Sequence, residues 1–356
     1  MNTRKENRDR NLNIDILRVV CSIFIVIIHI IDFYILNYNE IGEIFWTFIN
    51  IFESFIRFAV PIFFMISGAL LIKNFKESAI TFYKKRLIKI VVPYILISIF
   101  YSIGNQILKN GIISLEIIIK NILTFDAHYH LWFFEPLIGI YLIVPLIRKV
   151  IVYLENNNKK IIINGYLAIW TSLGIILPTI INIYSLSSIR YGIEVVNYLG
   201  YFIMGYAISN YYKSFFKGKE NWVLLIYLVA VLTTIAGNHF YLNRETGIYN
   251  NYFIYPMTLN IYVQSVSIFI YFNLKVIKLN KSVTSIIQSI SVSSIYIYLL
   301  HPIFILIVKD ILKINLFVGN LFFKCFFVIS IVSLLTIVAS IIAFKTFNFL
   351  TKTIIK

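Results

Sequence analysis

The chain has 356 residues, of which 59% are hydrophobic and 13% are charged, and its mean hydropathy is +0.83. A soluble globular domain carries about 25% charged residues, so this composition excludes a soluble enzyme and predicts an all-α polytopic membrane protein. The net charge of +16 raises the question of a nucleic-acid partner. We expect none, because the basic residues follow the loops between apolar runs and do not gather in one patch.

Ten apolar runs of membrane-spanning length follow one another along the chain. They predict ten transmembrane helices in one domain over residues 12–346, with short tails at 1–11 and 347–356. The runs cover residues 12–36, 45–72, 87–108, 131–153, 161–182, 194–212, 221–241, 252–274, 286–308 and 316–346.

Lys and Arg are divided unequally between the two sets of connecting segments. With the N-terminus placed in the cytoplasm, 23 of the 32 basic residues fall on the cytoplasmic side and 6 on the outer side. Cytoplasmic loops are enriched in Lys and Arg. We therefore expect a multi-pass protein of the cell membrane with both termini in the cytoplasm.

The first apolar run contains three ionisable side chains, Asp15, Arg18 and His29. Eleven helical steps return His29 to within about 20° of the direction of Arg18, and Asp15 lies one turn before Arg18. Ionisable groups inside a span are costly and indicate a functional site that faces the protein interior. The structural alternative is an Asp15–Arg18 ion pair at the membrane surface and a hydrogen-bonded core histidine.

The second run contains Arg57, followed by Pro61 and the pair Ser67–Gly68. We expect Arg57 to lie near the membrane midplane and to face a cavity or an acid. Pro61 predicts a kink, and the Ser-Gly pair favours close helix packing.

A basic segment precedes the third run and contains Lys84, Lys85, Arg86 and Lys89. Arg86 and Lys89 are one turn apart at the expected start of the third helix, where they can bind a cytosolic ligand that carries phosphate. The alternative is an ordinary basic cytoplasmic loop.

The fourth run begins with a second group of ionisable residues. Glu135 lies about one turn inside the run, which makes it a candidate partner for Arg57 or a general base. His128 and His130 form a pair that resembles a metal site, but Asp126 is the only carboxylate nearby. We therefore expect no metal.

The ninth run contains Ser294, Tyr298 and His301, spaced so that they share one face of a helix. The predicted topology places His301 at the same depth as His29. We expect these two histidines to converge with Tyr298 and Glu135 in an acid–base site in the outer half of the membrane.

Taken together, six segments in this order resemble the acyltransferase-3 family of integral membrane acyltransferases. The first is the family pattern of a basic residue, ten positions and a histidine, here Arg18 and His29, and the resemblance covers essentially the whole chain. The others are Val60–Gly68, Lys84–Tyr94, His130–Ile147, Leu199–Ile208 and Ser293–Phe304.

The resemblance implies transfer of an acyl group, usually acetyl, from cytosolic acyl-CoA to a glycan or another acceptor. It implies that His29 is catalytic, that Arg18 supports it or the donor, and that Arg86 with Lys89 replaces the family's Arg-x-x-Arg motif. A lysine can hold a phosphate but cannot form the bidentate fork of arginine. Acetyl-CoA is expected as a donor substrate, with no permanently bound cofactor.

We therefore predict an O-acyltransferase without the C-terminal esterase-like domain of many relatives, acting on an extracytoplasmic or lipid-linked glycan. The donor thioester would cross the bundle directly or through a covalent relay, and proteins of polysaccharide synthesis or export are expected partners. The predicted catalytic residues are His29, Arg18, Glu135, Tyr298 and His301; the donor-binding residues are Lys84, Lys85, Arg86 and Lys89; the further intramembrane polar residues are Asp15, Arg57 and Ser294.

Two other functions agree with the same features. Kinked helices with Arg57, Glu135 and His29 inside the membrane also fit a transporter or flippase for a glycan or a lipid-linked sugar. A structural subunit of a synthase complex is a third interpretation, which predicts little effect from substitution of the polar residues.

Overall fold

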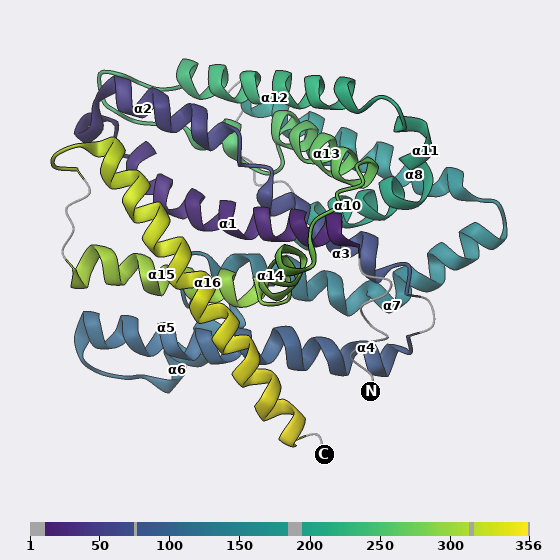
Figure 1. Cartoon of the computed structure of the whole chain (residues 1–356), viewed down its shortest axis with the longest axis horizontal. Coiled ribbons are helices and arrows are strands. Elements are labelled where there is room, and N and C mark those ends of the chain that lie inside the picture. The colour runs from purple at the N-terminus through teal and green to yellow at the C-terminus, as the bar shows by residue number, and fades with distance from the viewer. Residues whose placement is uncertain (1–10, 75–76, 184–193, 313–316, 355–356) are drawn as a thin grey trace.

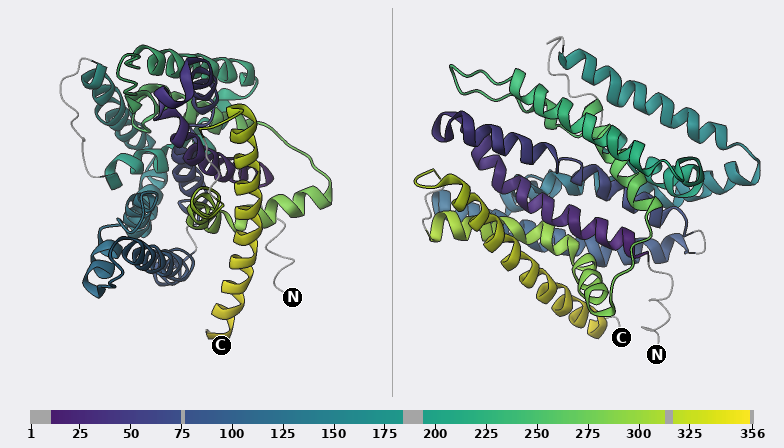
Figure 2. Two further views of the ribbon diagram at one scale, coloured as in Figure 1. Left: turned by 90° about the vertical axis from the view of Figure 1, so that its left-hand side faces the viewer. Right: turned by 45° about the horizontal axis from the view of Figure 1, so that its top comes forward.

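A computed structural model describes residues 11–74, 77–183, 194–312 and 317–354, and the long helices of this part of the chain lie side by side in a bundle (Figures 1 and 2). The α-helices are α1 (Leu12–Ile35), α2 (Tyr38–Ser54), α3 (Ala59–Leu71), α4 (Ala79–Arg86), α5 (Val92–Asn110), α6 (Leu115–Leu123), α7 (Phe134–Asn156), α8 (Lys160–Trp170), α9 (Leu177–Ile183), α10 (Glu194–Ala207), α11 (Lys213–Phe216), α12 (Glu220–Phe240), α13 (Leu259–Leu274), α14 (Lys281–Val292), α15 (Ser294–Leu306) and α16 (Leu321–Ile354).

Short irregular helices connect several of these elements. The π-helical turns are Leu87–Val91, Thr171–Ile176, Ile208–Tyr212 and Ile307–Ile311, and the 3-10 turns are Leu131–Phe133 and Asn251–Ile254. In the described residues, eight helical segments are long and apolar enough to cross a membrane, and nine if the bent pair α14–α15 counts as one span. The structure therefore supports an all-α membrane protein.

The expected run 194–212 accounts for the difference from ten spans. It forms α10 and the following π-helical turn, and α10 packs mainly against α3 and α7. Glu194, Asn197 and several tyrosines reduce its mean hydropathy. Such residues are tolerated here because this helix contacts protein over much of its surface. The final helix, α16, crosses the bundle obliquely (Figure 1) and continues to Ile354, past the expected end at residue 346.

Two expected continuous spans are broken, and both breaks lie at polar residues. The run 45–72 is divided into α2 and α3 at residues 55–58, around Arg57. Pro61 explains this break, because a proline ring clashes with the carbonyl four residues earlier, which is that of Arg57. The run 286–308 is divided into α14 and α15, which are bent by 72° around Ser293.

The third run also differs from the expectation. A helix begins at Ala79, two turns before Arg86, and passes through the π-helical turn Leu87–Val91 into α5. Arg86 and Lys89 therefore lie inside a continuous helical segment and not at its start. π-Helical turns are found often at functional sites.

Two glycines bring α3 and α10 into backbone contact. A Cβ atom on Gly68 would overlap the carbonyl oxygen of Phe202, and one on Gly205 would overlap the backbone of Met65. Small residues allow this close approach between membrane helices, and the contact holds α3 in the centre of the bundle.

We expect Gly205→Ala to lower the melting temperature of the detergent-solubilised protein, because the added methyl group meets backbone that has no room to move. Overpacking costs about 1–3 kcal/mol. Gly165→Ala is the matched control, since a Cβ at this helical glycine meets no atom within 4 Å. An equal melting temperature for both variants would contradict the proposed contact.

Candidate active site

A cavity of about 310 Å³ lies where the break between α14 and α15 meets α1, α7, α16 and the π-helical turn Leu87–Val91. Three cationic side chains line it, Arg18, Arg86 and Lys89, together with Ser291 and Ser294 from the break. None of the described residues that line it is Asp or Glu. We call this space the cationic cavity, and its charge suits an anionic ligand.

Asp15 lies behind the cationic cavity and helps to hold Arg18. The Ser291 hydroxyl donates to Asp15 Oδ1 at 2.6 Å, and Arg18 Nη1 donates to the same hydroxyl at 3.4 Å. Asp15 is only 3% exposed. These contacts join α1 to α14, and they place the Arg18 end of the predicted polar stripe in the cationic cavity.

Arg86 enters the cationic cavity across two aromatic rings. Its guanidinium carbon lies 5.0 Å from the ring centre of Phe82 and 5.6 Å from that of Tyr141. Cation–π contacts of this kind hold a guanidinium in place. Arg86 Nε is buried and makes no hydrogen bond in the described part of the chain, so the two rings and not an acid hold this guanidinium.

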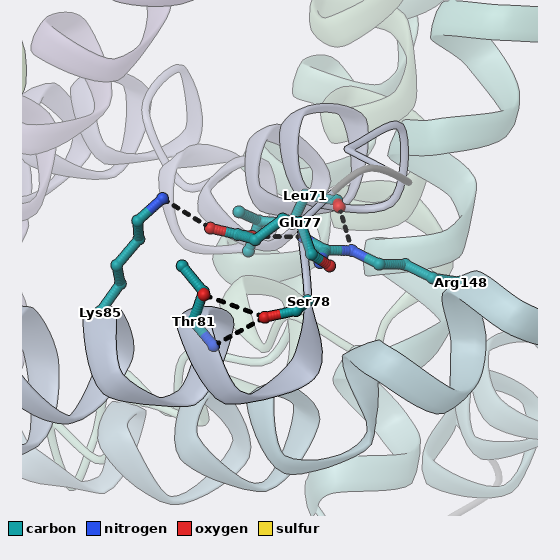
Figure 3. Close-up of polar contacts among 6 residues, drawn as sticks. All are labelled: Leu71, Glu77, Ser78, Thr81, Lys85 and Arg148. Atoms are coloured by element: carbon teal, nitrogen blue, oxygen red, sulfur yellow. Dashed lines mark hydrogen bonds and ion pairs between the residues drawn. The ribbon is translucent and has the colours of Figure 1, made fainter.

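Phe82 also connects Arg86 to a buried ion pair, shown in Figure 3. Arg148 lies over Phe82 with its guanidinium carbon 4.7 Å from the ring centre. Arg148 Nη2 contacts Glu77 Oε2 at 3.0 Å, and its Nε donates to the carbonyl oxygen of Leu71 at 2.8 Å. The pair Glu77–Arg148 thus ties the end of α3 to α7 and supports the ring on which Arg86 rests.

The same glutamate binds Lys85, which changes the expected donor site. Lys85 Nζ lies 2.8 Å from Glu77 Oε1 (Figure 3), and Lys84 is exposed. Neither lysine lines the cationic cavity. Of the four basic residues predicted to bind the donor, Arg86 and Lys89 are the two that line it, because Glu77 holds Lys85 and Lys84 points to the exposed side.

We expect Glu77→Gln to destabilise the protein by about 3 kcal/mol at pH 7, since removal of one partner exposes the cost of a buried charge on Arg148. Burial alone would raise the pKa of Glu77, but hydrogen bonds from Lys85 and Arg148 hold that pKa below 4.5. A depressed pKa adds stability above the unfolded-state value, and this stability is lost as pH falls through the folded-state value.

The difference in melting temperature between wild type and Glu77→Gln should therefore be full at pH 7 and shrink below pH 4.5. Thermal unfolding in detergent over this pH range measures it. Lys85→Met is the control, because Lys85 is 52% exposed and an exposed ion pair contributes at most about 1 kcal/mol. A constant difference over the whole range would contradict the role of the Glu77 carboxylate.

Four of the five histidines of the chain form a cluster next to the cationic cavity. His29 of α1 stacks on His301 of α15 with ring centres 4.9 Å apart. The ring of His301 lies 5.1 Å from that of His130, and His130 Nδ1 lies 2.9 Å from His128 Nδ1. In the described residues, no group of three or more His, Cys, Asp or Glu is arranged to hold a metal ion.

The hydrogen bonds of this histidine cluster determine where its protons lie. His301 Nδ1 lies 2.7 Å from the carbonyl oxygen of Tyr298, which can only accept, so Nδ1 carries the proton and the buried Nε2 keeps a lone pair. Burial, with a smaller effect of nearby His29, lowers the pKa of His128 to about 4. His128 is therefore neutral at pH 7.

A carboxylate that the sequence analysis missed lies beside His29. Asp32 Oδ2 is 3.6 Å from His29 Nδ1, and Asp32 Oδ1 is 2.7 Å from Arg57 Nη2. Arg57 also contacts Glu53, which is fully buried. An acid on Nδ1 orients an imidazole so that Nε2 acts as the base, as in the aspartate–histidine pairs of hydrolases.

The acyltransferase domain family matches residues 11–344. The chain belongs to the acyltransferase-3 family. Curated relatives include a protein of Staphylococcus aureus strain Mu50 named "Probable poly-beta-1,6-N-acetyl-D-glucosamine export protein", which is 23% identical over 81% of this chain and 80% of the relative. The protein of the same name from strain MSSA476 is 22% identical with the same coverage. No solved structure matches the chain.

In this acyltransferase-3 protein, Tyr298 and Phe133 separate the cationic cavity from the histidine cluster. Both residues line the cavity, and their ring centres are 4.9 Å apart. The Tyr298 hydroxyl donates to the carbonyl oxygen of His130, and its ring lies 5.8 Å from that of His301. None of the four clustered histidines lines the described cavity. Arg18 thus lines the cationic cavity, whereas His29 belongs to a cluster of side chains packed against the far side of this aromatic wall.

The structure does not pair Glu135 with Arg57, and a role of Glu135 as a general base stays a prediction. In the described residues, no hydrogen bond or ion pair joins Glu135 to Arg57 or to the histidine cluster, although it lies half-buried at the start of α7. Asp32 and Glu53 are the acids that pair with Arg57. Both were detectable, because Asp32 is one turn after His29 and Glu53 is one turn before Arg57.

Proposed function

We propose that this protein is an O-acyltransferase that moves an acyl group, in the simplest case acetyl, from cytosolic acyl-CoA to a hydroxyl of an extracytoplasmic or lipid-linked glycan. The observation that carries the proposal is the arrangement of the cationic cavity and the His29–Asp32 pair on the two faces of the Tyr298–Phe133 wall. The cavity suits the phosphates of a donor, and the pair on the other face supplies a base for an acceptor.

The donor would enter the cationic cavity from the cytoplasmic side, with its phosphates on Arg18, Arg86 and Lys89. Arginine and lysine bind phosphate through charge-assisted hydrogen bonds, and all three side chains line the cavity. Arg18 and His29 are eleven positions apart on α1, or about 16 Å along its axis. A donor whose phosphates lie on Arg18 would therefore have its reacting carbonyl about this far along α1, near His29.

His29 would act as the general base on the acceptor. With Asp32 on Nδ1, Nε2 takes the proton of the acceptor hydroxyl while the oxygen attacks the thioester carbonyl. The carbon–sulfur bond then breaks, and CoA leaves as the thiol after it takes the proton from His29. A covalent relay is the other route, in which the acyl group first bonds to a side chain and then passes to the acceptor.

The acyl group has to pass Tyr298 and Phe133 by either route. His301, stacked on His29, is proposed to hold the imidazole in line with this wall, and Ser294 lies on the cavity side of the same helix. Lys84 and Lys85 would attract the anionic donor to the membrane surface without entering the cavity.

Arg86→Ala should weaken the binding of acetyl-CoA to the purified protein by about 10- to 100-fold, since hydrogen bonds to charged groups contribute about 1.5–3 kcal/mol. Isothermal titration in detergent measures this. Lys84→Ala is the matched control, because it removes an exposed cation from the same helix outside the cavity. Equal affinities for wild type and Arg86→Ala would contradict the donor site.

Transfer itself is tested with membranes that contain the protein, acetyl-CoA labelled in the acetyl group, and surface polysaccharide from cells that lack the protein. Label in the polysaccharide with wild type, and none with His29→Ala, is the expected result. A mass shift of the polysaccharide when the protein is removed from cells would identify the acceptor, which we propose is an exopolysaccharide hydroxyl.

The name of the Staphylococcus aureus relatives favours a second candidate, export of a polysaccharide, and transport of a lipid-linked sugar is a variant of it. The charge of the cavity argues against the polymer itself as the ligand, since a polymer of N-acetylglucosamine has no anionic groups for three cations to bind, whereas acyl-CoA and a lipid-linked sugar both carry phosphate. An exporter should move its substrate across vesicle membranes without acyl-CoA, whereas the enzyme should bind CoA and produce an acylated glycan. Association with polysaccharide synthesis or export proteins fits both.

A further inference from the structure

The part of the cationic cavity contributed by α16 differs in chemistry from the cationic part. Phe344, Phe347 and Asn348 of α16 line it opposite the basic residues, together with Tyr296 of α15. The ring centre of Tyr296 lies 6.1 Å from those of Phe344 and Phe347. We call these four residues the α16 face. It offers aromatic rings and one amide, and no charge.

The amide of Asn348 has unused hydrogen-bonding capacity. Its side chain is half-buried at the cavity, and the described part of the chain supplies no hydrogen-bond partner for the amide group. An asparagine amide donates one hydrogen bond and accepts another in one plane, which matches the edge of adenine. Aromatic side chains stack on bases without regard to sequence. A purine base therefore satisfies both parts of the α16 face.

We propose that the α16 face binds the adenine base of the acyl-CoA donor while Arg18, Arg86 and Lys89 bind its phosphates. This inference rests on the proposed function, and it assigns the residues that recognise the nucleotide. Asn348 lies three residues before the end of the candidate span at Thr351, so the base sits near the membrane surface. The acyl end of the donor then points to the Tyr298–Phe133 wall.

A phosphate-bearing lipid is the main rival ligand for the same cations. An apolar groove between α15 and α16 shares Tyr296 and Phe347 with the cavity and is otherwise lined by Ala339, Ile342, Ala343, Thr346 and Leu350. A lipid would place its chain there. Asn348 lines the cationic cavity and not this groove, and a lipid chain has no use for an amide. The position of Asn348 therefore favours the nucleotide.

Two probes test the proposal with the full-length protein in detergent: acetyl-CoA, and acetyl-4′-phosphopantetheine, which lacks the nucleotide. Asn348→Ala and Phe347→Leu should each weaken acetyl-CoA binding by about 5- to 100-fold, the range expected for a bidentate amide–base pair or a base–aromatic stack. Neither should change binding of the phosphopantetheine probe. Phe323→Leu, at an exposed phenylalanine on the same helix, is the control and should bind both probes as wild type does.

The outcomes separate this inference from the proposed function. If wild type binds neither probe, the proposed function fails. If wild type binds both probes but the two variants weaken both equally, or weaken neither, the donor site stands and the adenine assignment is overturned. Displacement of acetyl-CoA by vesicles of anionic phospholipid, with equal potency for wild type and Asn348→Ala, would assign the α16 face to lipid. Should Asn348→Ala fail to fold, Phe347→Leu and the wild-type ratio between the probes decide.

Discussion

Replacement of His29 by alanine should reduce acyl transfer by about 100- to 10,000-fold, the range that a positioned general base contributes. His29 is the histidine of the cluster with an acid near Nδ1, since Asp32 Oδ2 lies 3.6 Å away, and we propose on this ground that its Nε2 is the base. His130 and His301 contact backbone or other rings instead. The measurement is the initial rate of label transfer from acetyl-CoA to polysaccharide in membranes.

The control for His29→Ala is His239→Ala, since His239 contacts Arg244 on another part of the bundle and lies outside the cluster. His239→Ala should keep the wild-type rate. The His29 variant should also bind acetyl-CoA as wild type does, because His29 does not line the cationic cavity. A His29 variant with full activity at equal expression would remove this residue from the mechanism, and one with no CoA affinity would place it in the donor site.

Asp32→Asn should lower kcat by about 100-fold or more and leave the KM for acetyl-CoA unchanged. An amide in place of the carboxylate no longer fixes the proton on Nδ1 of His29, and a similar change in the serine-protease triad, a worked example of this effect, costs about 10,000-fold. The informative readout is a lower kcat with an unchanged KM. Loss of folding would lower the number of sites that bind the donor, but it would not lower kcat when the rate is divided by that number.

Because of Glu53, we do not expect Asp32→Asn to lose activity through misfolding alone. Arg57 keeps its contact with Glu53 when Asp32 becomes neutral, so the buried guanidinium stays paired. Glu43→Gln is the matched control, since Glu43 is an exposed acid paired with Arg244. A rate for Asp32→Asn within twofold of wild type would show that Asp32 binds Arg57 without orienting His29.

Contacts along one helix were open to prediction, while contacts between helices were less so. The spacing of Arg18 and His29 on α1, and of Ser294, Tyr298 and His301 on α15, follows from the helical period alone. The equal depth of His29 and His301 followed from the topology, and the structure stacks their rings. Asp32 lies one turn from His29 and close to the same stripe, so this contact was open to prediction as well, although it was not predicted.

The pairing of acids with bases could not be deduced in the same way. Glu53 lies one turn before Arg57, whereas Asp32 belongs to α1 and only the fold brings it to Arg57. Glu135 is a half-buried acid in an apolar run as well, and no local pattern shows that Asp32 and not Glu135 reaches Arg57. Likewise, four adjacent basic residues gave no sign of which ones face a cavity. Glu77 decides this for Lys85, and Glu77 lies in a short connection whose position depends on Arg148 of α7.

The amino-acid sequence by itself determined the membrane character of the chain, the approximate limits of most spans, and which residues share a face of a helix. These properties depend on hydropathy and on a fixed number of residues per turn. The tertiary structure alone decided the bend between α14 and α15, the contact of Asp32 with Arg57, and how a cationic cavity adjoins four histidines. These depend on the distances between helices, which are set by contacts such as those of Gly68 and Gly205 that no local pattern encodes.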